Sequence, residues 1–362
     1  MSDFTIKGFD HLAFYVSNAK QASQYYRSMF GFQPVAYGGL ETGVRDKASY
    51  VLKQNKIMFV LSSPLEDDSL IGEHIKKHGD GVKDVALRVD DATAAYEISL
   101  ERGADPAYAP TILEDDNGKV TLSAIKTYGD TIHSFVERDE FNGTFLPEMM
   151  DLDMPEIDNP VGLTHIDHIV GNQASDCMTP VVEWYEKILG FHRIWTVDDK
   201  DISTEYTSLR SIVVADESER VKMPINEPAD GLKKSQIQEF IDFYKTAGVQ
   251  HVAMYTKDII ATVKNLKSRG VEFISIPKEY YDEVLDRVGK IDEDIEVLAK
   301  LGILVDRDDD GYLLQLFTQP VQDRPTLFYE IIERKGARSF GKGNFKALFE
   351  SIELEQEKRG NL

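Results

Sequence analysis

The stretch Ile166-Asp167-His168-Ile169-Val170 has the pattern of a β-strand, and a related stretch, Phe9-Asp10-His11-Leu12-Ala13-Phe14, stands near the start of the chain. Each is followed by an amphipathic helical pattern and then by a glycine, Gly190 or Gly31, that is expected to end the helix. The two stretches therefore predict the same strand-helix-strand order in both halves of the chain.

Two further pairs of related segments follow in the same order. Residues 81–87 resemble residues 248–254, and Phe135-Val136-Glu137 resembles Phe328-Tyr329-Glu330. Three such echoes predict a duplicated unit of roughly 150 residues, far longer than the period of a solenoid repeat. In this alignment His168 matches His11, Glu330 matches Glu137, and His251 matches Asp84.

Length and composition also suit two domains. A chain of 362 residues is long enough for two. The proline-rich and acid-rich stretch 146–160 is expected to be the linker, which gives an N-terminal domain of residues 1–150 and a C-terminal domain of residues 151–362. The stretch 280–300 predicts one or two amphipathic helices, and Asn344 is expected to cap a final helix that starts at Phe345.

The overall charge limits the classes of partner. Asp and Glu total 63 against 41 Lys and Arg, a net charge of −22, which argues against nucleic acid and anionic membranes. No apolar run is long enough for a membrane span, and no secretory signal is evident, so a cytoplasmic location is expected. The single cysteine, Cys177, excludes a disulfide within one chain and a cysteine-based zinc site.

Three residues in the second half have the composition of a 2-His-1-carboxylate metal site. His168, His251 and Glu330 each lie on a strand-like stretch and share a face with apolar neighbours. Such a set leaves coordination positions open on Fe(II) for substrate and O₂. The alternative is that both histidines are hydrogen-bonded core residues and that Glu330 pairs with an arginine. Because the first half has an acid in place of the middle histidine, it is expected to be structural.

The second half resembles the 4-hydroxyphenylpyruvate dioxygenase family of the vicinal-oxygen-chelate superfamily. The stretches that carry the resemblance are 166–172, 205–211, 222–228, 234–240, 248–251, 311–317, 322–330 and 340–345. The resemblance covers nearly all of residues 160–361, and it extends more loosely to residues 8–145 through the repeat. It implies an α+β fold of two tandem domains, each of paired βαβββ modules in a barrel-like sheet, with a C-terminal helix over the active site.

The resemblance also implies roles for individual residues. His168, His251 and Glu330 would bind one Fe(II) per chain. Polar groups of the catalytic pocket are implied at Ser211, Asn226, Gln236, Gln250 and Gln315. Substrate-packing positions are implied at Phe317, Phe340, Phe345, Leu348, Phe349, Pro224 and Leu304. Strict alternation sends Gln250 to the face opposite His251, so Gln250 either acts indirectly or is turned inward by a β-bulge.

The implied reaction joins 4-hydroxyphenylpyruvate and O₂ to give homogentisate and CO₂, by oxidative decarboxylation, ring hydroxylation and side-chain migration, in tyrosine catabolism. The family is usually homodimeric or homotetrameric, so a homo-oligomer is expected. The nearest alternative is a hydroxymandelate synthase, which hydroxylates the benzylic carbon of the same substrate. An extradiol dioxygenase and a non-catalytic small-molecule-binding protein of the same fold are more distant alternatives.

Overall fold

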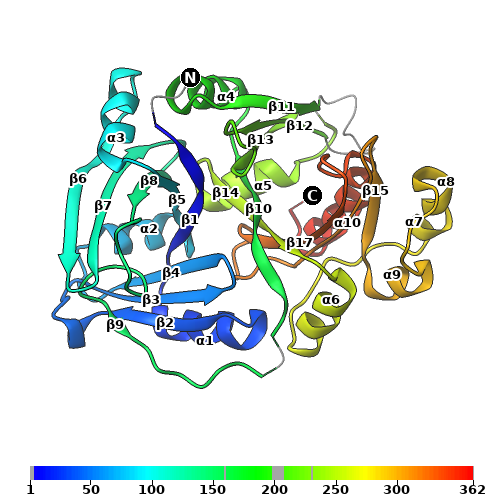
Figure 1. Ribbon diagram of the computed structural model, residues 1–362. Coiled ribbons are helices and arrows are strands. Elements are labelled where there is room, and N and C mark those ends of the chain that lie inside the picture. Colours follow the sequence, from blue (N-terminus) through cyan, green and yellow to red (C-terminus); the bar gives the residue numbers. More distant parts are fainter. Residues whose placement is uncertain (1–3, 159, 198–207, 230, 362) are drawn as a thin grey trace.

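A computed structural model describes residues 4–158, 160–197, 208–229 and 231–361, and Figure 1 shows them as two curled sheets side by side. Residues 205–207 of the predicted family-matching stretch 205–211 lie outside the described residues. Within the described ranges, no helix is both long and apolar enough to cross a membrane.

The first half forms a sheet whose strands follow the order β6-β7-β8-β5-β1-β4-β3-β2-β9. The strands are β1 (Ile6–Tyr15), β2 (Gln33–Gly38), β3 (Lys47–Gln54), β4 (Ile57–Pro64), β5 (Gly81–Val89), β6 (Pro106–Asp115), β7 (Gly118–Lys126), β8 (Ile132–Glu137) and β9 (Met150–Asp151). The helices of this half are α1 (Ala19–Phe30), η1 (Leu40–Thr42), α2 (Leu70–His78) and α3 (Ala92–Glu101).

The second half repeats this topology with the strand order β11-β12-β13-β10-β14-β17-β16-β15. Its strands are β10 (Leu163–Asn172), β11 (His192–Val197), β12 (Ser208–Ala215), β13 (Lys222–Ala229), β14 (Gly248–Thr256), β15 (Leu304–Arg307), β16 (Tyr312–Phe317) and β17 (Phe328–Lys335). Its helices are α4 (Met178–Leu189), α5 (Gln236–Tyr244), α6 (Ile259–Ser268), α7 (Glu279–Asp282), α8 (Val284–Val288), α9 (Ile295–Leu301), η2 (Lys342–Asn344) and α10 (Phe345–Lys358). Each half thus consists of two βαβββ modules, as predicted.

Local sequence signals account for the ends of the matching helices. α1 ends at Gly31 and α4 ends at Gly190, and both glycines have the left-handed backbone conformation, with φ of 74° and 70°. This backbone conformation strains residues that carry a Cβ atom, which is why glycine stops both helices. Between α6 and β15, where one or two helices are predicted, the chain forms the three short helices α7, α8 and α9.

The predicted linker does not lie wholly outside the sheets. Its residues Met150 and Asp151 form β9 and pair with β2, so the first sheet extends into this stretch. The bounds of residues 1–150 and 151–362 for the two domains stay a prediction.

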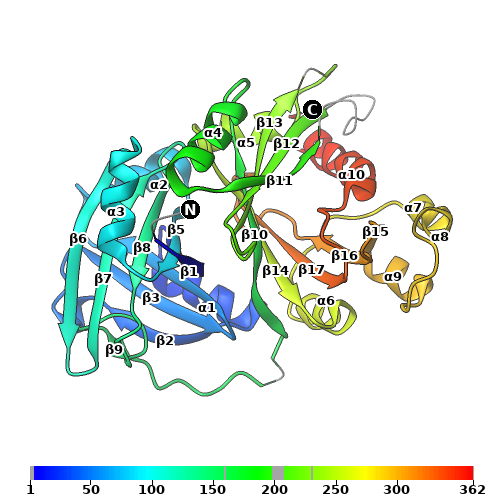
Figure 2. The same cartoon turned by 45° about the horizontal axis from the view of Figure 1, so that its top comes forward.

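The two halves share a buried contact beside β17. Tyr329 on β17 donates a hydrogen bond of 2.7 Å to the hydroxyl of Tyr26 on α1. Its ring also packs on Phe30 and Phe59, with ring centroids 5.1 Å and 6.1 Å away. Alternate residues of a strand point to opposite faces. Glu330, the residue after Tyr329, therefore points to the inner face of the curled second sheet. Figure 2 shows α10 on the side of the second half away from the first.

Candidate metal centre and substrate pocket

The three predicted ligands come together on the three central strands of the second sheet. His168 lies on β10, His251 on β14 and Glu330 on β17, which are neighbours in the strand order. One nitrogen or oxygen of each residue lies within 4.8 Å of the others, and all three residues are buried. Oε2 of Glu330 lies 3.2 Å from Nε2 of His168 and 3.5 Å from Nε2 of His251.

Two β-bulges between β10 and β14 set the direction of these side chains. The register changes between Ile166 and His168, so Asp167 is an extra residue on β10. It changes again where Val170 faces His251 and Gly171 faces Val249, so Gln250 is an extra residue on β14. A bulge breaks the alternation of side chains. For this reason Gln250 and its neighbour His251 both line the same cavity.

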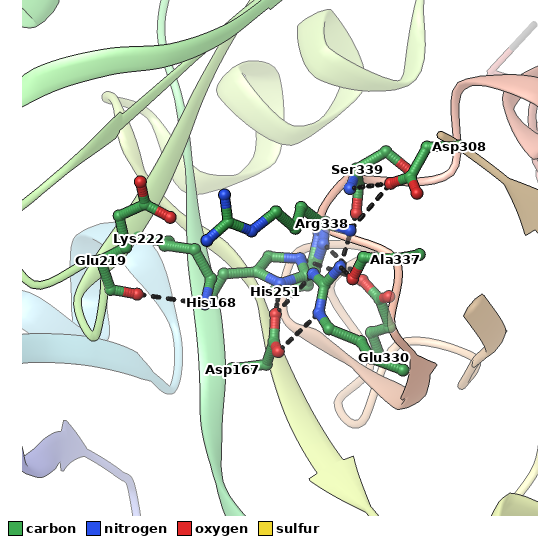
Figure 3. A network of polar contacts seen from close by, with 11 residues as sticks. Asp167, His168, Glu219, Lys222, His251, Asp308, Glu330, Ala337, Arg338 and Ser339 are labelled. Atoms are coloured by element: carbon green, nitrogen blue, oxygen red, sulfur yellow. Dashed lines mark hydrogen bonds and ion pairs between the residues drawn. The ribbon is translucent and has the colours of Figure 1, made fainter. Parts of the chain in front are cut away.

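His168 is held from behind by a charged network (Figure 3). Its Nδ1 donates a hydrogen bond of 2.7 Å to the Asp167 carboxylate. Arg334 donates to both oxygens of Asp167 at 2.8 Å, and it also donates to the backbone oxygen of Ser339 at 2.6 Å. The guanidinium lies over the ring of Phe340, 5.4 Å from its centroid. This network fixes the orientation of the imidazole and leaves Nε2 facing Glu330.

His251 is oriented by two amides instead. Its Nδ1 lies 3.0 Å from Oε1 of Gln250, and Nε2 of Gln250 donates to Oε1 of Gln236 over 3.4 Å. With Nδ1 donating, Nε2 of His251 is again the nitrogen that faces Glu330. Because Gln236 accepts through Oε1, its Nε2 group is not used in this chain of amides and can donate to another group.

The electrostatics of the triad favour an ionised carboxylate. Burial alone would raise the pKa of Glu330, but the imidazoles of His168 and His251 lower it to about 2. Burial lowers the pKa of His251. For His168 burial also acts to lower the pKa, but Glu330 and Asp167 outweigh it and the pKa is raised.

This donor set fits a divalent metal such as Fe(II). Two imidazole Nε2 atoms and one carboxylate oxygen converge, and the Nδ1 atom of each histidine is engaged, as is usual for metal ligands. Among the described residues, no other group of three or more His, Cys, Asp or Glu side chains has this proximity.

A cavity with an empty volume of about 520 Å³ opens beside the triad. Its wall contains all three predicted ligands, all five predicted polar residues and six of the seven predicted packing residues. These are His168, His251, Glu330, Ser211, Asn226, Gln236, Gln250, Gln315, Phe317, Phe340, Phe345, Leu348, Phe349 and Pro224. The wall thus combines amides and a hydroxyl with aromatic rings, which is the composition expected for an aromatic ligand with polar ends.

Leu304 is the exception among the predicted pocket residues. It pairs with Gln315 between β15 and β16, and its side chain is buried in the apolar cluster that includes Phe317 and Leu348. It supports the wall without lining the cavity.

Four lining residues were not predicted: Val170, Trp195, Leu209 and Phe328. Val170, Leu209 and Phe328 share a strand face with His168, Ser211 and Glu330, so alternation could have identified them. Trp195 lies on β11, a strand that contains none of the predicted pocket residues.

A second cavity shares Gln236, Gln250 and Phe328 with the first, and it extends to Glu355 and Arg359 near the end of α10. There Arg359 donates to both oxygens of buried Glu239 on α5, at 3.2 and 2.8 Å. Asn361 donates to the same carboxylate at 2.8 Å. These contacts fasten the end of α10 over the pocket.

The first half keeps the framework of the site and the histidine at the first predicted ligand position, but not the second and third predicted ligands. Asp10 is the extra residue of a matching bulge, and it accepts from Nδ1 of His11 at 2.7 Å and from Arg138 at 2.9 Å. The guanidinium of Arg138 lies 4.9 Å from the ring centroid of Phe145, as Arg334 lies over Phe340. Asp84 pairs with Ala13, two residues after His11, and His251 pairs with Val170, two residues after His168. Asp84 is therefore the structural equivalent of His251.

The predicted match between Glu330 and Glu137 is wrong by three residues. Ile132 pairs with Asp84 as Phe328 pairs with His251, which puts Ser134 in the place of Glu330. Glu137 instead matches Glu333. The two carboxylates accept from the first backbone N–H of α3 and α6, at 3.1 and 2.8 Å. The dipeptides Glu137-Arg138 and Glu333-Arg334 were the sequence signal for this alignment.

Comparison with known proteins agrees with this duplicated architecture. Residues 165–316 match the glyoxalase, bleomycin resistance protein and dioxygenase superfamily, and residues 2–154 match the N-terminal domain of hydroxyphenylpyruvate dioxygenases. A triple mutant of 4-hydroxymandelate synthase from Streptomyces coelicolor has a similar structure. Its TM-score is 0.87 at 29% identity, over 98% of this chain and 100% of that one.

Curated relatives are more similar in sequence. The 4-hydroxyphenylpyruvate dioxygenase of Dictyostelium discoideum is 51% identical over 99% of this chain and 100% of its own length. That of Xenopus tropicalis is 52% identical over 100% of this chain and 97% of its own length. The fold and the family matches define an enzyme of the glyoxalase and dioxygenase superfamily. Within that superfamily, the chain belongs to the 4-hydroxyphenylpyruvate dioxygenase family.

Proposed function

We propose that this enzyme converts 4-hydroxyphenylpyruvate and O₂ into homogentisate and CO₂ in tyrosine catabolism. The observation that carries the proposal is the convergence of two histidines and a glutamate on a cavity walled by amides and aromatic rings. In this reaction the 2-oxo acid side chain is oxidised and loses CO₂. One oxygen atom of O₂ enters the new carboxylate and the other becomes a ring hydroxyl, while the shortened side chain moves to the adjacent ring carbon.

We assign metal binding to His168, His251 and Glu330, with one Fe(II) per chain. A bound Fe(II) would supply a position for the 2-oxo acid next to O₂ and would carry the redox change. The ionised Glu330 neutralises one positive charge of the cation. Asp167 and Gln250 keep the Nδ1 protons of the two histidines turned away from the ligand position.

We assign substrate positioning to the polar and aromatic wall. The catalytic set is Ser211, Asn226, Gln236, Gln250 and Gln315, and the amides among them orient the oxygen atoms of the substrate without adding charge. Ser211 and Asn226 face each other across β12 and β13, so they act as one polar pair. The packing set is Phe317, Phe340, Phe345, Leu348, Phe349 and Pro224, with Leu304 behind it. Its rings hold the substrate ring and exclude water from the reacting atoms.

Product identification tests the proposed reaction. The protein is loaded with Fe(II), incubated with 4-hydroxyphenylpyruvate and O₂, and the product is separated by chromatography and identified by mass spectrometry. We expect homogentisate. 4-Hydroxymandelate as the product would assign the chain the activity named for its structural neighbour, and no O₂ uptake would overturn both assignments.

Two wider predictions stay open to experiment. A homodimer or homotetramer is expected, and light scattering after size-exclusion chromatography measures the mass of the assembly. A cytoplasmic location is expected, and cell fractionation tests it.

A further inference from the structure

Asn344 stands directly before α10, where the sequence predicts that its side chain caps the helix. The side chain makes no capping hydrogen bond. It is fully buried and joins two other groups instead. Its Nδ2 donates to Oε1 of Gln315 over 3.2 Å, and its Oδ1 accepts from the hydroxyl of Tyr280 over 2.6 Å. A fully buried amide with both ends engaged is well placed to orient the pocket residue that it touches.

The direction of this amide is determined by Arg287. Nη2 of Arg287 lies 3.3 Å from Oδ1 of Asn344, and its two N–H groups also serve the hydroxyl of Tyr280 at 2.8 Å and the backbone oxygen of Val305 at 2.9 Å. A guanidinium carries only donors, so the group that faces it must accept. Arg287 is itself held by Asp306, whose Oδ1 accepts from Nη1 over 2.8 Å. The oxygen of Asn344 therefore points to Arg287, and its NH₂ group points to Gln315.

Gln315 connects Asn344 to the cavity. The Asn344 NH₂ group can only donate, so Gln315 must present Oε1 to it, and its own NH₂ group lies on the cavity side. In the described part of the chain, Nε2 of Gln315 has no protein partner. The left-handed Gly341, with φ of 78°, packs so closely that a Cβ atom there would lie 2.0 Å from Oε1 of Gln315. The loop thus encloses the accepting end of the amide.

We infer that Asp306, Arg287 and Asn344 form a relay that makes Gln315 an obligatory hydrogen-bond donor toward the substrate, with Asn344 as the positioning residue. The ligand group that Gln315 receives is then an acceptor oxygen, either the ring oxygen or an oxygen of the 2-oxo acid. This inference rests on the proposed function for the identity of the substrate. It specifies that Gln315 donates a hydrogen bond into the pocket. It also identifies three residues outside the cavity wall that orient the Gln315 amide.

The substitution Asn344→Asp tests the polarity directly. The new carboxylate can still accept from Tyr280 and Arg287, so the network stays paired and the loop is expected to fold. Toward Gln315 it offers only an oxygen, so the Gln315 amide must turn and present Oε1 to the cavity. Loss of a donor and gain of an opposed acceptor should weaken substrate binding by about 10-fold to 100-fold, because a buried acceptor of the substrate is left without its partner.

Binding of 4-hydroxyphenylpyruvate without O₂, measured by calorimetry, and the separate values of KM and kcat are the readouts. The matched background is Gln315→Met, which has no amide to orient. In that background Asn344→Asp should change the dissociation constant less than twofold. Phenylpyruvate, which lacks the ring oxygen, identifies the acceptor. Loss with 4-hydroxyphenylpyruvate alone assigns the ring oxygen, and equal loss with both compounds assigns the 2-oxo acid.

Two results would overturn the inference: unchanged binding in Asn344→Asp, or an equal loss in the Gln315→Met background. The second result would show that Asn344 acts through the fold rather than through Gln315. Failure of the proposed function is distinguishable, because the unsubstituted protein would then neither bind nor convert 4-hydroxyphenylpyruvate.

Discussion

The two halves of this chain share a strand order, three register shifts between their central strands and an Asp-His-Arg framework. Among the described residues, only the second half brings together three side chains that could hold a metal. His168 and His11 are held in the same way, by a preceding aspartate and an arginine that lies over a phenylalanine. The positions of His251 and Glu330 are taken in the first half by Asp84 and Ser134. There the backbone N–H of Ser134 donates to Asp84 over 2.9 Å, and its hydroxyl donates to the same carboxylate.

The difference shows that the framework and the ligands are separable. The bulges and the buried Asp-Arg pair organise the sheet in both halves, whereas chemistry depends on two further side chains. A site of this fold is therefore recognised by what fills the second and third ligand positions, and paired substitutions in the two halves test that view.

The largest effect is expected at the second ligand position. His251→Ala should remove bound iron and bring turnover below detection, because two ligands alone do not retain the metal in an open site. The matched variant Asp84→Asn should keep one iron per chain and normal turnover. Metal content by mass spectrometry and O₂ uptake are the measurements. Iron lost from Asp84→Asn would show that the first half contributes to the site.

A smaller effect is expected from the arginines behind the first ligand. Arg334→Met leaves Asp167 without its charged partner and should weaken iron binding about 10-fold to 100-fold, as is typical for groups that orient metal ligands. Arg138→Met makes the same change beside Asp10, which retains Arg88 at 3.3 Å. Calorimetric titration with Fe(II) should show a loss only for Arg334→Met. An equal loss in both variants would contradict the separation of the halves.

Among the described residues of the first half, no helix corresponds to α10, and the attachment of α10 gives the next comparison. Arg359→Met leaves buried Glu239 with Asn361 alone, so the helix end should open more often. Protection from hydrogen exchange in α10 should fall about 10-fold, which corresponds to about 1.4 kcal/mol of local stability. Lys358→Met is the control, because its ion pair with Glu355 is exposed on the lysine side. Similar exchange in both variants would exclude a role for the Arg359–Glu239 pair.

The smallest effect concerns stability in the first half. Burial raises the pKa of Asp84, although His11, Ser134 and Lys83 oppose the shift. A raised pKa in the folded state means that stability falls as pH rises from the unfolded pKa through the folded pKa. Asp84→Asn removes this loss of stability, and the new amide can still bond to Ser134. The free energy of unfolding should therefore rise by about 1 kcal/mol at neutral pH. Thermal unfolding between pH 4 and 8 measures it, and an unchanged pH dependence would refute the assignment.

Much of this architecture could be predicted from the sequence because it depends on local patterns. Alternation placed His168, His251 and Glu330 on strands, and Gly31 and Gly190 marked the ends of matching helices. Where local rules failed, longer-range structure decided the outcome. Gln250 faces the pocket because of a bulge that depends on pairing with β10. Asn344 does not cap its helix because Gln315 and Tyr280 offer buried partners. The mistaken match of Glu137 arose because an aromatic-x-Glu pattern recurs three residues from the true equivalent.

Tyr329 connects the first half to the folding of the second half. The ribosome makes the first half of the chain before β17, and domains made early generally fold first. Tyr26, Phe30 and Phe59, whose rings contact Tyr329 in the folded chain, are therefore made before Tyr329. With Tyr329 packed against these rings, the adjacent Glu330 points to the opposite face of β17, toward His168 and His251. The half that is made first thus supplies the aromatic surface against which the strand of the third predicted ligand packs.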